Sequence, residues 1–198
     1  MAIVEIVRVP TETILLEVIC FGNKLSFSVC ARHSGTGGIC VANEFLQKGI
    51  RGTSAHTDAA VVFEGLDWQQ AGEKPEKCPH SVWQLLWHMN YWQDFMLAYL
   101  KGEAPRNPEH AAETWPEDPR PASEQDWVQE VERFSAGLQQ AEQESAKDFS
   151  EEGFGRKRRT RADLIMVIIN HNSYHAGQAV FVRRMIGTWP PPSGGDTW

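Results

Sequence analysis

Apolar residues recur at intervals of three and four along most of the chain after residue 44, which is the period of a helix. The clearest stretch lies between Ser81 and Gly102. Ser81 and Gln84 have the spacing of a capping box, and Gly102 is a typical helix stop. The pattern therefore predicts a long helix over residues 81–102. Its apolar positions are Val82, Leu85, Leu86, Met89, Trp92, Phe95, Met96 and Tyr99.

Two further helices are predicted in the second half of the chain. Ser123 begins the first, with Asp126 at its third position, and its inner face repeats from Trp127 to Ala141. Thr160 and Asp163 cap the second, which runs to Gly187. This last helix carries apolar residues around much of its surface, namely Leu164, Ile165, Val167, Ile168, Tyr174, Val180, Phe181 and Met185.

Weaker helical patterns surround residues 45–50 and residues 57–66, the latter after a cap at Ser54 or Thr57. Five prolines mark residues 103–122 as a loop, and Gly153 and Gly155 break the helix that starts at Ser123. Because no strand pattern occurs after residue 44, the sequence predicts an all-α bundle.

The first 43 residues have a different pattern. Short β-branched and apolar runs at 3–9, 14–21 and 25–29 alternate with turn residues, which fits a small hairpin or an unstructured arm. We expect residues 1–43 to be an atypical N-terminal extension, either disordered or the product of an over-long start assignment. Residues 44–198 would then form one domain, in agreement with a length of 198 residues and 41% apolar content.

The net charge of the chain bears on which kinds of molecule it binds. The chain has 19 basic and 26 acidic side chains and a net charge of −7, which disfavours nucleic acid as a partner. A basic run at 156–159, followed by Arg161, fits either a phosphate or nucleic-acid patch or a solvated loop before a helix. The shortness of the run and the acidity of the chain favour the loop.

Cysteine usage and the N-terminus indicate a compartment. The four cysteines have no paired zinc-ligand spacing and are too few for a disulfide scaffold. The N-terminus lacks the layout of a signal peptide, and no apolar run approaches the roughly 20 residues of a membrane span. We therefore expect a cytoplasmic protein with free thiols that does not enter a membrane.

Histidines supply the candidate chemistry. His171 and His175 lie four residues apart on the last helix, so both imidazoles share one face and both could bind one metal ion. His88 lies in the middle of the helix over residues 81–102. If the two helices pack together, the three imidazoles form a metal site that leaves coordination positions open, as catalytic sites do.

Other residues lie near these histidines in helical spacing. Tyr91, Asn170 and Gln178 are candidates to orient the imidazoles through hydrogen bonds. Trp92, with Trp87 and Trp189, could wall an apolar pocket, although core packing explains these tryptophans equally well. An H-E-x-x-H pattern is absent, which argues against a zincin-type protease.

The phrases HSVWQLLWHMNYWQ (His80–Gln93), INHNSYHAGQ (Ile169–Gln178) and GTWPPPSGGDTW (Gly187–Trp198) resemble the DinB-like family over residues 44–198. The resemblance implies a four-helix bundle, often a homodimer, with a divalent metal bound by His88, His171 and His175. The segment GTSAH also resembles a phrase of some members, so that His56 either lines the pocket or begins a helix.

The wider superfamily includes transferases that use bacillithiol, mycothiol or glutathione, and this implies a function. The leading hypothesis is a metal-dependent enzyme that transfers a low-molecular-weight thiol to a small electrophilic substrate, or hydrolyses that substrate. The alternative is a non-catalytic metal-binding protein of a stress response. Three imidazoles suit Zn, Ni, Fe and Cu alike, and the sequence identifies no catalytic residue.

Overall fold

The computed structural model divides the chain into two compact units, Met1–Gly38 and Ile39–Trp198, each of which is described by itself. Side chains are described over residues 44–148, 150–155 and 157–195. The backbone is described over residues 3–8, 13–20, 23–30, 41–148, 150–155 and 157–195.

The first unit contains a three-stranded antiparallel sheet in the order β1-β2-β3. Its strands are β1 (Ile3–Arg8), β2 (Thr13–Cys20) and β3 (Asn23–Cys30). In the register of the sheet, Glu17 of β2 pairs with Glu5 of β1 and with Ser26 of β3. The three apolar runs seen in the sequence thus each form a strand. The division of the chain at residue 43 stays a prediction.

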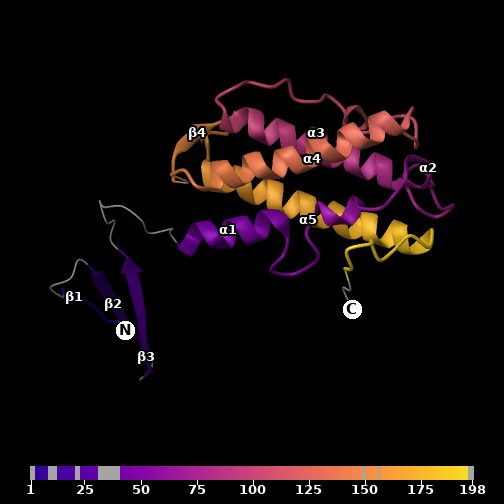
Figure 1. The fold of residues 1–198 in the computed structure, drawn as a ribbon. Helices are drawn as coiled ribbons and strands as arrows, with labels where there is room; N and C mark the ends of the chain where they lie inside the picture. Colours follow the sequence, from indigo (N-terminus) through magenta and orange to yellow (C-terminus); the bar gives the residue numbers. More distant parts are fainter. Residues whose placement is uncertain are drawn as a thin grey trace. The chain divides into compact units, whose positions relative to one another are not determined.

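The second unit is a bundle of four long helices (Figure 1), which confirms the predicted all-α fold. These are α1 (Val41–Arg51), α3 (Val82–Leu100), α4 (Glu124–Ser145) and α5 (Arg161–Met185). Shorter pieces connect them: the 3-10 turns η1 (Val61–Phe63) and η2 (Ala111–Thr114) and the single turn α2 (Trp68–Ala71). No described helix has both the length and the apolar content needed to cross a membrane.

The long helices begin where local side chains cap them. The Ser81 hydroxyl accepts from the backbone N–H of Gln84 at 3.2 Å, and Thr160 forms the same box with Asp163. The Ser81 hydroxyl also donates to the carbonyl of Pro119 at 2.6 Å. This bond fastens the proline-rich loop to the start of α3.

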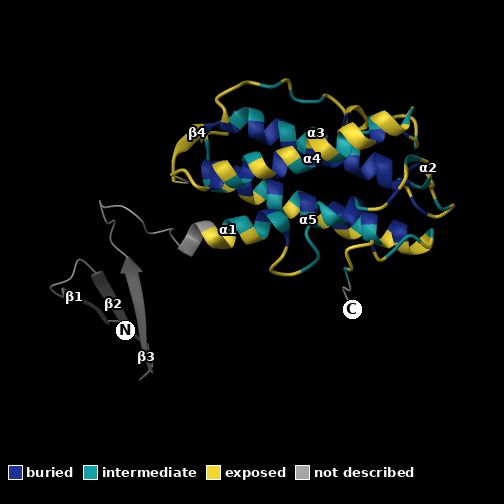
Figure 2. Cartoon of the chain, viewed as in Figure 1, coloured by how far each residue is buried: buried dark blue, intermediate teal, exposed yellow. Residues whose placement is uncertain are grey.

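The core lies between α3, α4 and α5, where the dark blue residues of Figure 2 gather on the inner faces of the helices. A polar link crosses it. The Gln93 amide donates to the carbonyl of Phe134 at 3.2 Å and accepts from Asn172 at 2.9 Å. A Cβ at Gly137 would lie 2.0 Å from the Gln93 nitrogen, so glycine permits this close approach of α3 and α4. The link fixes Asn172, which adjoins His171.

The connection from α4 to α5 differs from the prediction, because it contains a small hairpin of β4 (Glu152–Phe154) and β5 (Arg159–Thr160). Gly153 and Gly155 adopt positive φ values of 107° and 63°, which glycine allows at no steric cost. Strands of three and two residues are too short to show an alternating pattern. The expectation of no strand after residue 44 was therefore wrong here.

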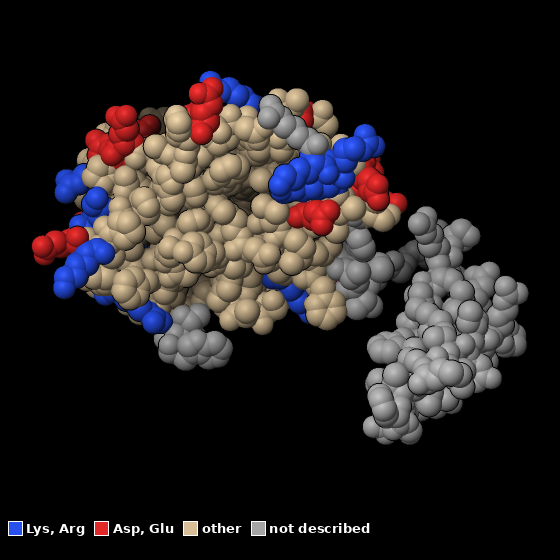
Figure 3. Space-filling view, turned by 180° about the vertical axis from the view of Figure 1, so that it is seen from behind, with Lys and Arg blue, Asp and Glu red and all other residues tan. Residues whose placement is uncertain are grey.

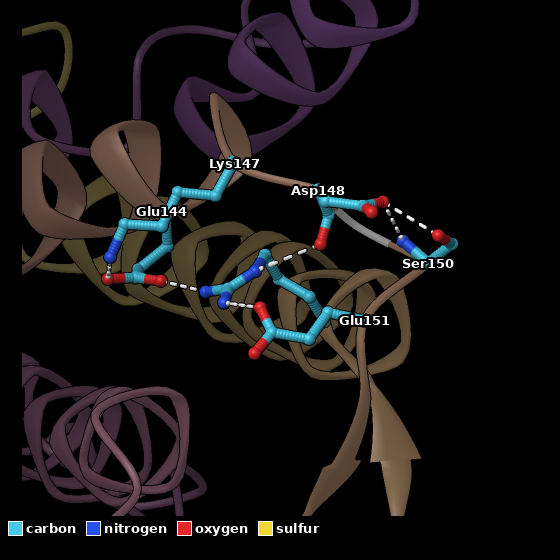
Figure 4. Close-up of polar contacts among 6 residues, drawn as sticks. Glu144, Lys147, Asp148, Ser150 and Glu151 are labelled. Atoms are coloured by element: carbon cyan, nitrogen blue, oxygen red, sulfur yellow. Dashed lines mark hydrogen bonds and ion pairs between the residues drawn. The ribbon is translucent and has the colours of Figure 1, made fainter.

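A buried ion network closes the same connection (Figure 4). Arg161 is 4% exposed, and its guanidinium bonds to the carboxylates of Glu144 and Glu151. Its Nε also donates to the carbonyl of Asp148 at 3.2 Å. Lys147 adds a second cation at 2.5 Å from Glu144. The network joins the end of α4 to the start of α5, and it makes Arg161 a structural cation.

Candidate metal centre

Three imidazoles meet where α3 and α5 pack side by side. His88 comes from α3, and His171 and His175 come from successive turns of α5. One nitrogen of each lies within 4.8 Å of the others, and Nε2 of His88 is 3.3 Å from Nε2 of His171. His88 and His175 are 7% and 8% exposed. The structure thus brings together all three histidines that the sequence proposed as ligands.

Hydrogen bonds orient two of the rings. The Nδ1 of His88 lies 2.8 Å from the carbonyl oxygen of Thr114, which can only accept, so this nitrogen carries the proton. The Nδ1 of His175 lies 2.6 Å from the amide oxygen of Gln178 and donates in the same way. The Nε2 of each ring therefore keeps its lone pair for a metal, and that of His88 lies against Nε2 of His171.

Burial sets the charge of the cluster. Desolvation lowers the pKa of His88 to about 4 and that of His171 to about 3, and the neighbouring imidazoles add to both shifts. Burial also lowers the pKa of His175. All three rings are neutral at physiological pH, which is the form that binds a metal.

The donor set fits a divalent metal. Three neutral imidazoles in one buried cluster have few other ways to satisfy their nitrogens. The buried Nδ1 of His171 has no hydrogen-bond partner among the described residues. The cluster contains no fourth His, Cys, Asp or Glu from the described part of the chain. Such a set leaves coordination positions for water or a substrate.

Aromatic rings enclose the cluster. The Trp115 indole stacks between His80 and His88, with ring centroids 3.7 Å apart and interplanar angles of 7° on both sides. Trp92 packs edge-on against His171, with centroids 6.4 Å apart. Trp92 was predicted, whereas Thr114 and Trp115 were missed because they lie in the proline-rich loop, which has no periodic pattern.

The other candidate residues near the cluster differ in position. Gln178 contacts His175 directly. Tyr91 instead stacks against Trp87, with centroids 5.8 Å apart. Asn170 is exposed on the outer side of α5. Of the three residues expected to orient imidazoles, only Gln178 is hydrogen-bonded to one.

His56 lies at another cavity. Its Nε2 is 3.1 Å from the Ser173 hydroxyl and its Nδ1 is 2.7 Å from the carbonyl of Thr57. The cavity it lines has a volume of about 200 Å³ and contains none of the three clustered histidines among its lining residues. Ser173 falls between His171 and His175 in sequence and therefore on the opposite face of α5.

Two further cavities lie along α3 and α5, and neither has one of the three clustered histidines among its lining residues. The first, of about 330 Å³, is lined by Gln178, Leu85, Tyr174 and His80 among others. The second, of about 280 Å³, is lined by Trp92 and residues of the β4–β5 hairpin. Gln178, which bonds to His175, lines the first cavity, and Trp92, which packs against His171, lines the second.

The structure is thus a four-helix bundle with a candidate metal centre, formed by three neutral histidines between two adjacent helices. The family model of the DinB superfamily matches residues 53–179, well over half of the chain, and includes all three histidines. The chain therefore belongs to the DinB superfamily. No curated protein matches the sequence.

Proposed function

We propose that His88, His171 and His175 bind one divalent metal, with Zn, Ni and Fe as the candidates, in an enzyme that acts on a small electrophilic molecule. The observation that carries this proposal is the meeting of three neutral imidazoles within 4.8 Å, two of them oriented through Nδ1. Membership of the DinB superfamily supports it. The reaction is either transfer of a low-molecular-weight thiol or hydrolysis.

A divalent metal lowers the pKa of a bound thiol or water and so supplies a nucleophile at neutral pH. The chain's own residues position the metal and exclude bulk water, with Trp92 and Trp115 flanking the imidazoles. In the transfer, the thiol gives its proton to solvent and sulfur forms a bond to carbon. The bond from that carbon to the leaving group breaks, and the leaving group keeps the electron pair.

The cavity beside Gln178 is the proposed place for the electrophile. Leu85, Pro79 and Val182 give it an apolar lining, and Gln178 joins it to His175. Its volume of about 330 Å³ lies within the range of small-molecule sites.

We also propose a homodimer in the cytoplasm. Large apolar side chains on α5 are exposed, with Tyr174 at 65%, Phe181 at 61% and Met185 at 48%. Apolar surface of this kind is typical of an interface. Sedimentation equilibrium of the purified chain measures the oligomeric state.

Metal analysis tests the site. We expect about one divalent metal per chain, because a single three-histidine site binds one ion. The double variant His171→Ala/His175→Ala should lose it. His56→Ala is the matched control, because it removes an imidazole that bonds to the other face of α5, and it should keep the metal. Full metal retention in the double variant would overturn the proposed site.

A thiol screen tests the reaction. The loaded protein is incubated with 1-chloro-2,4-dinitrobenzene and glutathione, bacillithiol or mycothiol in turn. Conjugation that needs both the metal and one thiol supports transfer, and metal-dependent chloride release without thiol supports hydrolysis. A metal-loaded protein inactive toward a broad panel of electrophiles would favour the non-catalytic alternative.

A further inference from the structure

The β4–β5 hairpin and the end of α3 enclose the cavity of about 280 Å³. It lies on the side of the cluster where α3 ends and α5 begins, and the hairpin carries most of the basic run noted in the sequence. The lining residues are Trp92, Phe95, Met96, Tyr99, Asn107, Phe154, Gly155, Lys157, Arg159 and Leu164.

One wall of this cavity is aromatic. Trp92, Phe95 and Tyr99 follow one stripe of α3, and successive ring centroids lie 5.3 Å and 5.0 Å apart. Phe154 of the hairpin and Leu164 of α5 add further apolar surface. Rings arranged in this way bind a planar apolar body through area burial and edge contacts.

Lys157 and Arg159 add positive charge to the lining of the cavity. Among the described residues, neither forms a salt bridge. The charge of Arg159 contributes to the lowered pKa of Asp163, but the two side chains form no salt bridge. The Asp163 carboxylate instead accepts a hydrogen bond from the Thr160 backbone N–H at 2.9 Å. Figure 3 shows Lys and Arg side chains at the edge of a hollow in a largely uncharged face, with Asp and Glu side chains next to them.

Two other cations of the basic run, Arg158 and Arg161, lie elsewhere. Arg161 is buried in the ion network, and Arg158 is exposed and does not line the cavity. Lys157 and Arg159 therefore line the cavity, whereas Arg158 and Arg161 do not. Asn107 adds a neutral polar group, which accepts from the Tyr99 hydroxyl at 3.4 Å.

We propose that this cavity binds a small aromatic carboxylate, with its ring against Trp92 and Tyr99 and its carboxylate toward Arg159 and Lys157. The inference is independent of the metal. Trp92 lies four residues from His88, about 6 Å along the helix, so a ligand here is one turn from the metal cluster.

Calorimetric titration of the full chain with 2-naphthoate tests the proposal, in metal-free and metal-loaded protein. The neutral 2-naphthylmethanol has the same ring system without the charge, and acetate has the charge without the ring. We expect 2-naphthoate to bind about tenfold or more tightly than either. Equal binding of the alcohol, or of acetate, would overturn the chemical class.

Two single variants locate the site. Arg159→Gln should weaken 2-naphthoate binding about tenfold, because it removes a cation that lines the cavity. Arg158→Gln removes the same charge from the same hairpin, but outside the cavity, and should leave the affinity within about twofold. Equal weakening by both variants would show a general surface attraction and overturn the proposal. Binding that persists in metal-free protein distinguishes this site from the metal centre.

A single-stranded oligonucleotide tests the alternative that this basic surface binds nucleic acid. We expect it not to displace 2-naphthoate. Displacement that depends equally on Arg158 and Arg159 would assign the basic run to nucleic acid and overturn the small-molecule site.

Discussion

The indole of Trp115 stacks on the imidazole of His88 with ring centroids 3.7 Å apart and an interplanar angle of 7°. The preceding residue, Thr114, accepts the Nδ1 proton of the same imidazole. Two consecutive residues of one loop therefore fix both the plane and the tautomer of His88. The connection between α3 and α4, at the end of the η2 turn, thus prepares a side chain of α3 for metal binding.

Trp115→Leu should weaken metal affinity about three- to tenfold, because the stacked ring restricts the motion of His88. Competition with a chromophoric chelator measures this affinity. His80→Ala removes the ring on the other face of Trp115 and should have a smaller effect, since the His88 contact remains. If Trp115→Leu leaves the affinity unchanged, the hydrogen bond to Thr114 alone orients His88.

Gln178→Ala should weaken metal affinity by about tenfold, because the acceptor for Nδ1 of His175 is lost. Gln178→Glu keeps an acceptor oxygen and should restore most of the affinity. Asn170→Ala is the matched control on the same helix, because Asn170 is exposed and should not change metal binding. The same chelator competition measures all three variants, and equal losses for Asn170 and Gln178 would refute the assigned role.

The metal-free protein should lose stability as pH falls below about 6.5. Unfolded imidazoles take up protons near pH 6.5, whereas the pKa values of His88 and His171 in the fold are about 4 and about 3. Between these values the unfolded chain binds more protons than the folded one, so the free energy of unfolding decreases as the pH falls.

Urea unfolding of metal-free protein at about pH 7.5 and about pH 5 measures this dependence. In the variant His88→Asn/His171→Asn the decrease should be smaller, because two of the titrating groups are absent. A decrease of the same size in the variant and in the unchanged protein would mean that other groups cause the acid sensitivity.

The starts of the helices were predictable because their caps are local. Ser81 and Gln84, and Thr160 and Asp163, lie three residues apart, so the sequence itself contains both partners of each bond. The pairing of His171 with His175 is local in the same sense. The position of His88 beside them depended on the packing of α3 on α5, and the family resemblance supplied that expectation.

Contacts between distant segments could not be predicted. The bond between His88 and Thr114 joins residues 26 positions apart, one of them in a loop whose prolines indicate only the absence of regular structure. The sequence also did not show which face of α5 is exposed, because apolar residues occur on all sides of this helix. Tyr174 and Phe181 fit the apolar pattern, yet they are 65% and 61% exposed.

The basic run shows the same difficulty, since charge alone does not separate a structural cation from a binding one. Arg161→Met should lower the free energy of unfolding by about 3 kcal/mol, because it leaves the buried Glu144 carboxylate without its main partner. Lys147→Met removes the other cation of the same carboxylate. It should cost less than about 1 kcal/mol, since the Lys147 side chain is 54% exposed. Urea unfolding at neutral pH compares the two variants, and similar losses would show that Glu144 does not depend on Arg161 for its burial.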